Sequence, residues 1–388
     1  MLKLIAFGEA LIDMLSNKIN NDTQGSETFT KYPGGAPANV AAATAMLGGN
    51  SYLAGKIGVD MFGAFMRQSL KAAKVNDQYL IDTTLAKTAL AFVSLDEQGE
   101  RSFSFYRDPS ADMLFSADDF ADSWFDDAGI FHFCSNTLTG DDIAAATIAG
   151  IEKAKNAGFC ISFDVNLREN LWPENRQALP LIWQCVRLSD ILKVSTEEMQ
   201  FICDGRDEGQ VLKQIFEHNV QLVLITDGSN SLRYIVRESN SKLISSATVT
   251  QLNLLDTCIE TASTTQTDLT VEGSVVSEAV EDPVTPKATE DSCTSTKGAA
   301  SQTDLWIEGS ILPPKIKMLD STAAGDAFIG GFLYQLCAQQ ITREKLAHFC
   351  QQQPALEYAL TFASHCGAHA ASIQGAFTSL PSLDDIKI

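Results

Sequence analysis

Short apolar segments alternate with helical segments along most of this chain, and this alternation limits the fold more than any other feature. Residues 2–7 form an apolar run that ends at Gly8, and an Ala-rich helical segment follows Gly34–Gly35 and stops at Gly48. Strands that alternate with helices in this way predict βαβ units. We therefore expect an α/β fold with a mostly parallel sheet that helices cover on both faces.

Two β-rich runs interrupt this alternation, at residues 88–95 and 101–107. Small polar and aromatic side chains alternate in the second run, SFSFY, which is the pattern of a half-exposed strand. We predict an antiparallel hairpin that belongs to a small second sheet.

The chain is strongly acidic. Its 388 residues include 28 Lys and Arg against 49 Asp and Glu, a formal net charge of −21. Binding to nucleic-acid phosphates needs clustered cations, and no such run exists, so we expect no nucleic-acid partner. No apolar run reaches the roughly 18 residues that a membrane-spanning helix needs, and the N-terminus predicts a buried strand rather than a signal peptide. The nine cysteines include no CxxC pair. Together these features predict a soluble cytoplasmic protein.

Residues 241–310 differ from the rest in composition. They hold eleven Asp and Glu against three Lys, and residues 266–274 and 302–310 match at seven of nine positions with a spacing of 36. Excess charge with low hydrophobicity predicts poor ordering. We interpret the segment as an acidic, Ser/Thr-rich insertion with an internal duplication, or alternatively as a docking element, between domain parts 1–240 and 311–388.

The most informative motif is DSTAAGDAF, at residues 320–328. Small residues run directly into a predicted helix start, so backbone N–H groups can converge on an anion and the helix dipole adds positive potential. Asp326 would lie in the first helical turn, where it could act as a general base for phosphoryl transfer. The alternative is an aspartate that only caps the helix.

A second small-residue motif is Gly34-Gly35-Ala36-Pro37-Ala38-Asn39. Its glycines would allow a ligand to approach the backbone, and Asn39 offers a donor and an acceptor. Asp13 follows the first strand and could accept hydrogen bonds from vicinal hydroxyls, or be a solvated turn residue.

Further candidates follow later strands. Arg168 lies at a strand's carboxyl end, where open α/β sheets bind ligands, although a solvent-facing strand end is the alternative. Glu198 could hold the hydration shell of Mg²⁺, or simply begin a helix. Thr226 and Gly228 close another apolar strand and could meet a nucleotide phosphate.

Other motifs are absent from the sequence. There is no Walker phosphate loop, no GxGxxG after the first strand and no GxSxG, which removes the commonest nucleotide-binding and hydrolase folds. His365 and His369 are spaced i,i+4 but lack the Glu of HExxH, so we predict packing rather than a metal site.

Taken in order, these motifs resemble the ribokinase-like carbohydrate kinase family of the phosphofructokinase-B type. The resemblance covers about residues 1–240 and 311–388. It is carried by GGAPAN, by GKIGVDMFG at 55–63 and above all by DSTAAGDAF, while DVNLRENLW and KVSTEEM look most like the bacterial fructokinase branch. The implied fold is a Rossmann-like three-layer sandwich with a small β-sheet lid, built from strands near 11–33 and 88–107.

The resemblance also implies roles for individual residues. Asp326 would be the base, beside an anion hole at Ala323, Ala324 and Gly325. The remaining roles are sugar binding by Asp13, Gly34, Gly35, Asn39, Phe105 and Arg168, nucleotide binding by Lys193, Thr226, Gly228 and Ser364, Mg²⁺ binding through water by Glu198, and K⁺ binding near Asp320, Ser321, Ser372 and Gly375.

The implied activity is phosphorylation of D-fructose to D-fructose 6-phosphate with Mg-ATP. The alternatives are another sugar, such as 2-keto-3-deoxygluconate or aminoimidazole riboside, and a regulator that binds sugar or nucleotide without turnover. A homodimer through the lid is a further expectation. The sequence departs from the family at Ser195, where many relatives have Asn, at Ser231, which replaces the last Gly of the nucleotide turn, and at Ala323, which replaces the first Gly of the anion hole.

Overall fold

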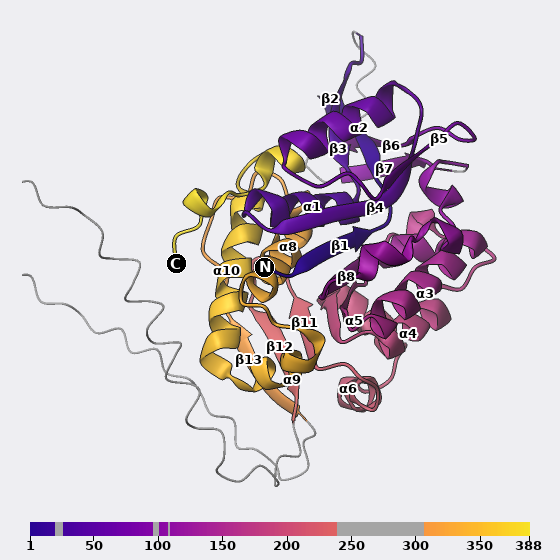
Figure 1. Ribbon diagram of the computed structural model, residues 1–388. Coiled ribbons are helices and arrows are strands. Elements are labelled where there is room, and N and C mark those ends of the chain that lie inside the picture. Colours follow the sequence, from indigo (N-terminus) through magenta and orange to yellow (C-terminus); the bar gives the residue numbers. More distant parts are fainter. Residues whose placement is uncertain (20–25, 96–100, 108, 239–305) are drawn as a thin grey trace, which may run out of the picture. The chain divides into compact units, whose positions relative to one another are not determined.

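The central element is a nine-stranded sheet with the strand order β13-β12-β11-β10-β9-β8-β1-β4-β5 (Figure 1). The computed structural model describes residues 1–19, 26–95, 101–107, 109–238 and 306–388. The strands are β1 (Lys3–Phe7), β4 (Asn50–Gly58), β5 (Leu80–Thr83), β8 (Gly129–Cys134), β9 (Cys160–Asp164), β10 (Ile191–Ser195), β11 (Leu222–Thr226), β12 (Leu232–Arg237) and β13 (Trp306–Ile311). Within this described sheet the pairs β11–β12 and β12–β13 are antiparallel and the others are parallel. The predicted mostly parallel sheet is confirmed.

Helices cover both faces of this sheet, as Figure 1 shows. One face carries α1, α8 and α10, and the other carries α3, α4 and α5. The helices are α1 (Ala36–Met46), α2 (Met61–Ala72), α3 (Asp141–Asn156), α4 (Ala178–Leu188), α5 (Thr196–Cys203), α6 (Glu208–Phe216), α8 (Ala324–Ala338), α9 (Arg343–Gln351) and α10 (Gln353–Ala371). The three-layer α/β architecture is therefore the one that the alternation of the sequence predicts.

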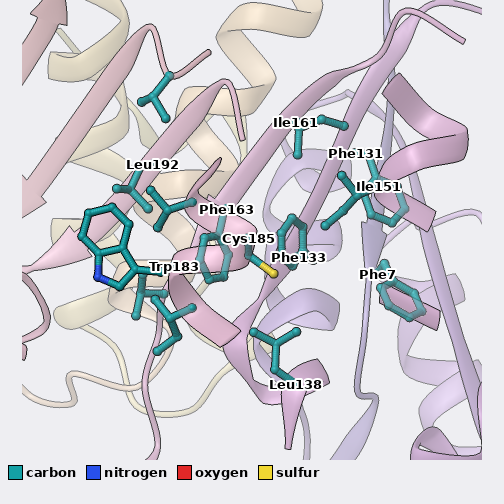
Figure 2. Close-up of a cluster of buried hydrophobic side chains, with 14 of the residues drawn as sticks. Phe7, Phe131, Phe133, Leu138, Ile151, Ile161, Phe163, Trp183, Cys185 and Leu192 are labelled. Atoms are coloured by element: carbon teal, nitrogen blue, oxygen red, sulfur yellow. The ribbon is translucent and has the colours of Figure 1, made fainter. Parts of the chain in front are cut away.

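The two faces of β1 belong to different parts of the core. Ile5 and Phe7 pack in the cluster beneath α3 and α4, whereas Leu4 and Ala6 pack toward α1 and α8. Figure 2 shows the first of these clusters, in which the rings of Phe133 and its neighbour on β9, Phe163, stack at 4.7 Å. Because a strand buried on both faces needs apolar residues, the continuous apolar run 4–7 follows directly from this environment, while Lys3 before it donates to the Trp124 carbonyl.

A second, four-stranded sheet has the order β3-β2-β6-β7. Its strands are β2 (Leu11–Ile19), β3 (Phe29–Gly34), β6 (Ala89–Leu95) and β7 (Arg101–Tyr106). β6 and β7 pair antiparallel, which confirms the predicted hairpin; its turn at 96–100 lies outside the described residues. We call this small sheet the lid.

The predicted insertion overlaps the central sheet at one end. Residues 306–310 belong to β13, which pairs with β12 in register from Leu232–Ile311 to Arg237–Trp306. The ring of Trp306 stacks on Phe216 of α6 at 6.0 Å, and this apolar contact holds the strand. The described fold therefore resumes at Trp306, five residues before the boundary that the composition suggested. The rest of the insertion lies outside the described residues.

Asp60 joins the start of α2 to the lid. Its carboxylate accepts hydrogen bonds from the backbone N–H groups of Phe62 and Gly63 and from both the N–H and the hydroxyl of Thr88, just before β6. Partial burial raises the pKa of Asp60, but these hydrogen bonds outweigh it, so the pKa lies below its ordinary value. The stability that such a group contributes is complete above the ordinary pKa and is lost as the pH falls through the folded-state pKa.

We expect Asp60→Ala to lower the free energy of unfolding by about 1 kcal/mol at neutral pH, as removal of a helix cap usually does. The difference between wild type and Asp60→Asn should be largest at neutral pH and shrink below the ordinary aspartate pKa of 3.8. Urea unfolding at a series of pH values measures both, with exposed Asp118→Ala as the control. A difference that stays constant with pH would contradict the assigned pKa direction.

Three further observations concern the described part of the chain. None of its helices is long and apolar enough to cross a membrane. Its seven cysteines are buried and unpaired. It contains no cluster of three or more His, Cys, Asp or Glu side chains arranged to hold a metal ion, and His365 instead bonds through Nδ1 to the carbonyl of Thr361.

Candidate active site

Segments that are distant in sequence meet at one edge of the central sheet. The carboxyl ends of the parallel strands lie at this edge, which is where open α/β sheets bind ligands. Asn39 on α1 bonds to Asp326 on α8, 287 residues away, and Gly325 lies beside Lys193 of β10. The two glycine-containing motifs of the sequence therefore form one site.

Asp326 lies in the first turn of α8 and is 9% exposed. Asn39 Nδ2 donates a hydrogen bond of 2.8 Å to its Oδ2. Burial raises the pKa of Asp326, although the bond from Asn39 and the charges of Lys193 and Arg168 oppose this effect. A buried carboxylate that an amide holds in one orientation is suited to accept a proton from a ligand hydroxyl.

The turn before α8 brings its small residues to the helix N-terminus. Ala323 has φ 58° and ψ 5°, a left-handed conformation that β-carbon sterics disfavour. The N–H of Ala324 donates to the Ser321 carbonyl at 3.2 Å, so this amide closes the turn. The hydroxyl of Thr322 is buried without a hydrogen-bond partner. The Thr322 hydroxyl and the positive end of the α8 dipole therefore lie in the same turn.

The conformation of Ala323 predicts opposite tolerances for two substitutions. We expect Ala323→Val to lower the free energy of unfolding by about 2 kcal/mol, because a β-branched side chain is strained at positive φ. Ala323→Gly should stay within about 1 kcal/mol of wild type, because relief of strain offsets the more flexible unfolded chain. Urea unfolding compares the two, and equal effects of Gly and Val would contradict the left-handed conformation.

The predicted sugar-binding residues come together at the base of the lid. A β-carbon on Gly34 would collide with the Asp13 carboxylate, which therefore lies directly over this glycine. Asp13 pairs with Ala91 on β6, and Ala91 pairs with Phe105 on β7. Residues directly opposite one another across strands point to the same face, so Asp13 and Phe105 share one face of the lid.

An unpartnered amide oxygen and an exposed arginine also lie near the predicted sugar-binding residues. Asn39 Oδ1 is buried without a hydrogen-bond partner, although its amide nitrogen is occupied by Asp326. Arg168 is exposed and close enough for its charge to lower the pKa of Asp326. Nearby, Asn170 Nδ2 donates to the Phe103 carbonyl at 3.1 Å and links this loop to the lid. Sequence reasoning missed this link, because nothing in the local pattern relates residue 170 to β7.

Glu198 stabilises two turns at once. Its Oε2 accepts from the Ser195 N–H at 2.8 Å, and its Oε1 accepts from the Leu167 N–H at 2.7 Å. Ser195 in turn caps α5 through the N–H of Glu198. Ser195 and Glu198 together form a capping box at the start of α5. Each carboxylate oxygen keeps a lone pair, so Glu198 fits binding of Mg²⁺ through water.

The other predicted nucleotide-binding residues lie on β10, on β11 and the turn after it, and on α10. Thr226 ends β11 directly opposite Ser195, and its hydroxyl donates to the Val194 carbonyl at 3.3 Å. Gly228 has φ 52° with open space around it. Ser364 is buried on α10, and among the described contacts none links it to Thr226 or Gly228. Lys193 directly precedes Val194, the residue whose carbonyl Thr226 contacts, but its ammonium is paired with Asp164 and faces Gly325.

The residues predicted for potassium lie in two loops that the structure joins. The carboxylate of Asp320 accepts hydrogen bonds from the N–H groups of Thr322 and Gly375, each at 2.8 Å. Ser372 donates to the His369 carbonyl, and the N–H of Asp320 donates to Ala371. Ser321 follows Asp320 in the same loop. These hydrogen bonds hold the two loops next to each other, and the loops offer carboxylate, hydroxyl and carbonyl oxygens, the donor type that K⁺ takes.

Glu9 is a buried carboxylate next to the GGAPAN segment that sequence reasoning did not include among the candidates. It is 2% exposed, and its Oε1 accepts from Asn136 Nδ2 at 3.0 Å and from the Ala36 N–H at 3.3 Å. Burial raises the pKa of Glu9, while the charge of Arg107 opposes this. An acidic residue directly after a buried strand was the available signal. Glu9 holds the start of α1, and with it the GGAPAN segment, against η4 (Ser135–Leu138).

Comparison with known proteins agrees with this fold. Residues 1–257 and 307–383 match the model of the pfkB family carbohydrate kinases. The chain is 31% identical to a probable chloroplastic fructokinase-6 from Arabidopsis thaliana, over 99% of this chain and 81% of that one. It is also 31% identical to the fructokinase of Vibrio alginolyticus, over 98% and 96% of the two chains.

Two solved structures extend the comparison. Fructokinase from Xylella fastidiosa with bound ATP superposes with a TM-score of 0.77 and 34% identity, covering 99% of this chain and 96% of that one. A fructokinase double mutant from Vibrio cholerae with fructose, ADP and potassium ion bound gives a TM-score of 0.71 and 29% identity, with coverages of 99% and 96%.

The sheet, the lid and the buried aspartate at the start of α8 define the ribokinase-like class of kinases. Within that class, the chain belongs to the pfkB family of carbohydrate kinases, enzymes that transfer a phosphoryl group to an alcohol.

Proposed function

We propose that this protein is an ATP-dependent fructokinase that converts D-fructose to D-fructose 6-phosphate with Asp326 as general base. One observation carries the proposal. Asp326 is buried, oriented by Asn39 and placed in the first turn of α8, where its carboxylate and a bound phosphate would be neighbours. The sugar is named from relatives, which are fructokinases of bacteria and plants.

In the proposed reaction the protein positions both substrates and neutralises charge. Asp13 and Asn39 Oδ1 accept hydrogen bonds from sugar hydroxyls, and Phe105 packs on the sugar from the lid. Asp326 takes the proton of the attacking hydroxyl as the oxygen–phosphorus bond forms and the bond to ADP breaks. The amides of Ala323, Ala324 and Gly325 hold the γ-phosphoryl, so the N–H of Ala324 must exchange its bond to Ser321 for one to phosphate.

Closure of the lid would exclude water from the phosphoryl group and so suppress hydrolysis of ATP. The hydrogen bond from Asn170 to β7 supports this role, because it ties the lid to the loop that carries Arg168.

Two cations fit the proposed site. Mg²⁺ would accompany ATP and be held through water by Glu198, where it shields phosphate charge. K⁺ would lie near Asp320, Ser321, Ser372 and Gly375, and the related Vibrio cholerae structure contains potassium. Thr226, Gly228 and Ser364 would lie along the nucleotide.

The wider organisation is also a proposal. We take residues 1–240 and 311–388 as the kinase domain, and β13 extends its second part back to Trp306. The rest of the segment 241–310 is then an insertion that is either inert or crowds the adenine entrance. A homodimer through the lid is the oligomer we propose. The buried, unpaired cysteines of the described residues support a reducing compartment, the cytoplasm.

The test is release of ADP from Mg-ATP at fixed K⁺, with D-fructose, aminoimidazole riboside, 2-keto-3-deoxygluconate, ribose or no sugar. We expect fructose to give the highest kcat/KM. A preference for another sugar would move only the substrate assignment. Folded protein that binds fructose or ATP but releases no ADP with any sugar would contradict the kinase proposal and favour a binding regulator.

A further inference from the structure

Lys193 and Asp164 form a buried ion pair that the proposed mechanism does not yet use. β9 and β10 are parallel neighbours, and their register places Lys193 directly opposite Asp164. Lys193 Nζ lies 3.0 Å from Oδ1 and 2.9 Å from Oδ2 of Asp164, so both carboxylate oxygens hold the ammonium. Lys193 is 7% exposed and Asp164 is 2% exposed. A pair held this way has little freedom to move.

The ammonium of Lys193 points at the N-terminal turn of α8. A β-carbon on Gly325 would lie 3.3 Å from Lys193 Nζ, so glycine leaves the space into which the ammonium projects. A helix N-terminus carries partial positive charge and repels a cation. Lysine at this place is therefore unfavourable unless an anion compensates it, and Asp164 supplies that charge in the free protein.

Burial raises the pKa of Asp164 to about 7, although the charge of Lys193 opposes this effect, so the carboxylate is ionised above about pH 7. Burial lowers the pKa of Lys193, but the negative charges of Asp164, Glu198 and Asp326 outweigh it and raise the pKa overall. His132, on the neighbouring strand β8, stays neutral because burial and the charge of Lys193 lower its pKa to about 3. The site thus holds a permanent cation that is directed toward the predicted anion hole.

We propose that Asp164 is a positioning residue that holds the Lys193 ammonium at the start of α8, where it binds the γ-phosphoryl group of ATP. This inference rests on the proposed function. It assigns Lys193 to the transferring group rather than to the rest of the nucleotide. Lys193 forms no covalent bond and gives up no proton: it neutralises phosphoryl oxygens while the bond to ADP breaks and Asp326 accepts the sugar proton.

Two nucleotides distinguish a contact to the γ-phosphoryl from a contact elsewhere. ADP lacks this group, and the non-hydrolysable ATP analogue AMP-PNP carries it. For Lys193→Met we expect AMP-PNP to bind about 10- to 100-fold more weakly in titration calorimetry, the usual effect of losing a charge-assisted hydrogen bond, and ADP to bind as in wild type. If Lys193→Met weakens the binding of both nucleotides equally, or weakens the binding of neither, the inference is overturned.

The role of Asp164 needs a double substitution, because Lys193→Met alone leaves a buried carboxylate unpaired. Asp164→Asn should lower kcat about 10-fold or more with little change in the KM for fructose. In Asp164→Asn/Lys193→Met, kcat should equal that of Lys193→Met, because Asp164 acts only through the lysine. A purely structural pair would instead lower the melting temperature and leave the discrimination between AMP-PNP and ADP unchanged.

A matched control is the ion pair between Arg233 and Glu308 on β12 and β13, with 2.7 Å between Nε and Oε1. We expect Arg233→Met/Glu308→Gln to leave kcat and nucleotide discrimination as in wild type. If wild-type protein phosphorylates no sugar, the proposed function fails, yet the nucleotide comparison still decides the role of Lys193. Wild-type protein that binds AMP-PNP no better than ADP would overturn the contact to the γ-phosphoryl.

Discussion

Asp326→Asn is expected to lower kcat by about 10³-fold while fructose and ATP still bind, because the amide cannot accept the proton of the attacking hydroxyl. The substitution keeps the shape of the side chain, and its amide oxygen can still accept the hydrogen bond from Asn39. Fructose-dependent release of ADP measures the rate, and calorimetry measures binding. Exposed Asp118→Asn is the control.

The same variant carries a prediction about stability. Burial raises the pKa of Asp326, so the folded protein is destabilised by the charge of this carboxylate at neutral pH. We therefore expect a melting temperature equal to or above that of wild type, which separates lost catalysis from lost folding. In wild type, kcat/KM should fall as the pH drops through a pKa above the ordinary aspartate value of 3.8. Retained activity in Asp326→Asn would contradict the assignment of the base.

Gly35→Ala is expected to lower the free energy of unfolding by about 3 kcal/mol, at the upper end of the effect of backbone strain. Gly35 has φ 99°, which L side chains rarely adopt, and an added β-carbon would collide with the backbone carbonyl of Glu9. The atoms that the β-carbon would meet belong to the backbone and cannot rotate away. Relief of the collision therefore requires movement of α1, and with it Asn39. We also expect the KM for fructose to rise.

Gly48→Ala is the matched control for this prediction. Gly48 has φ 89°, but an added β-carbon would meet nothing within 4 Å, so only the strain of the left-handed conformation remains. Urea unfolding should show a smaller effect for Gly48→Ala, with fructose KM unchanged. Equal effects of the two substitutions would show that the close approach to Glu9 is not important.

A second variant keeps the test informative if Gly35→Ala does not fold. Gly34→Ala would place its β-carbon against the Asp13 side chain, so this side chain must shift. We expect a folded protein whose KM for fructose is about 10-fold higher or more, since hydrogen bonds to charged groups contribute about 1.5–3 kcal/mol. An unchanged KM would contradict sugar binding by Asp13.

The alternation of apolar strands with helices determined the layers of this protein. Burial on both faces demands continuous apolar runs, and half-burial demands alternation, so both the central sheet and the lid hairpin could be predicted from local pattern. The position of Asp326 in the first turn of α8 could also be predicted from local pattern, because small residues that precede an aspartate are a local signal of a helix start.

Tertiary structure alone decided which charges meet. The pairing of Lys193 with Asp164 depends on the register of two strands, and the hydrogen bond between Asn39 and Asp326 joins residues 287 positions apart. The conformation of Ala323 and the occupied oxygens of Glu198 also depend on packing around turns. Local sequence encodes which face of an element is buried, whereas the distance between two side chains is set by how several elements pack together, and the chemistry of this site depends on that distance.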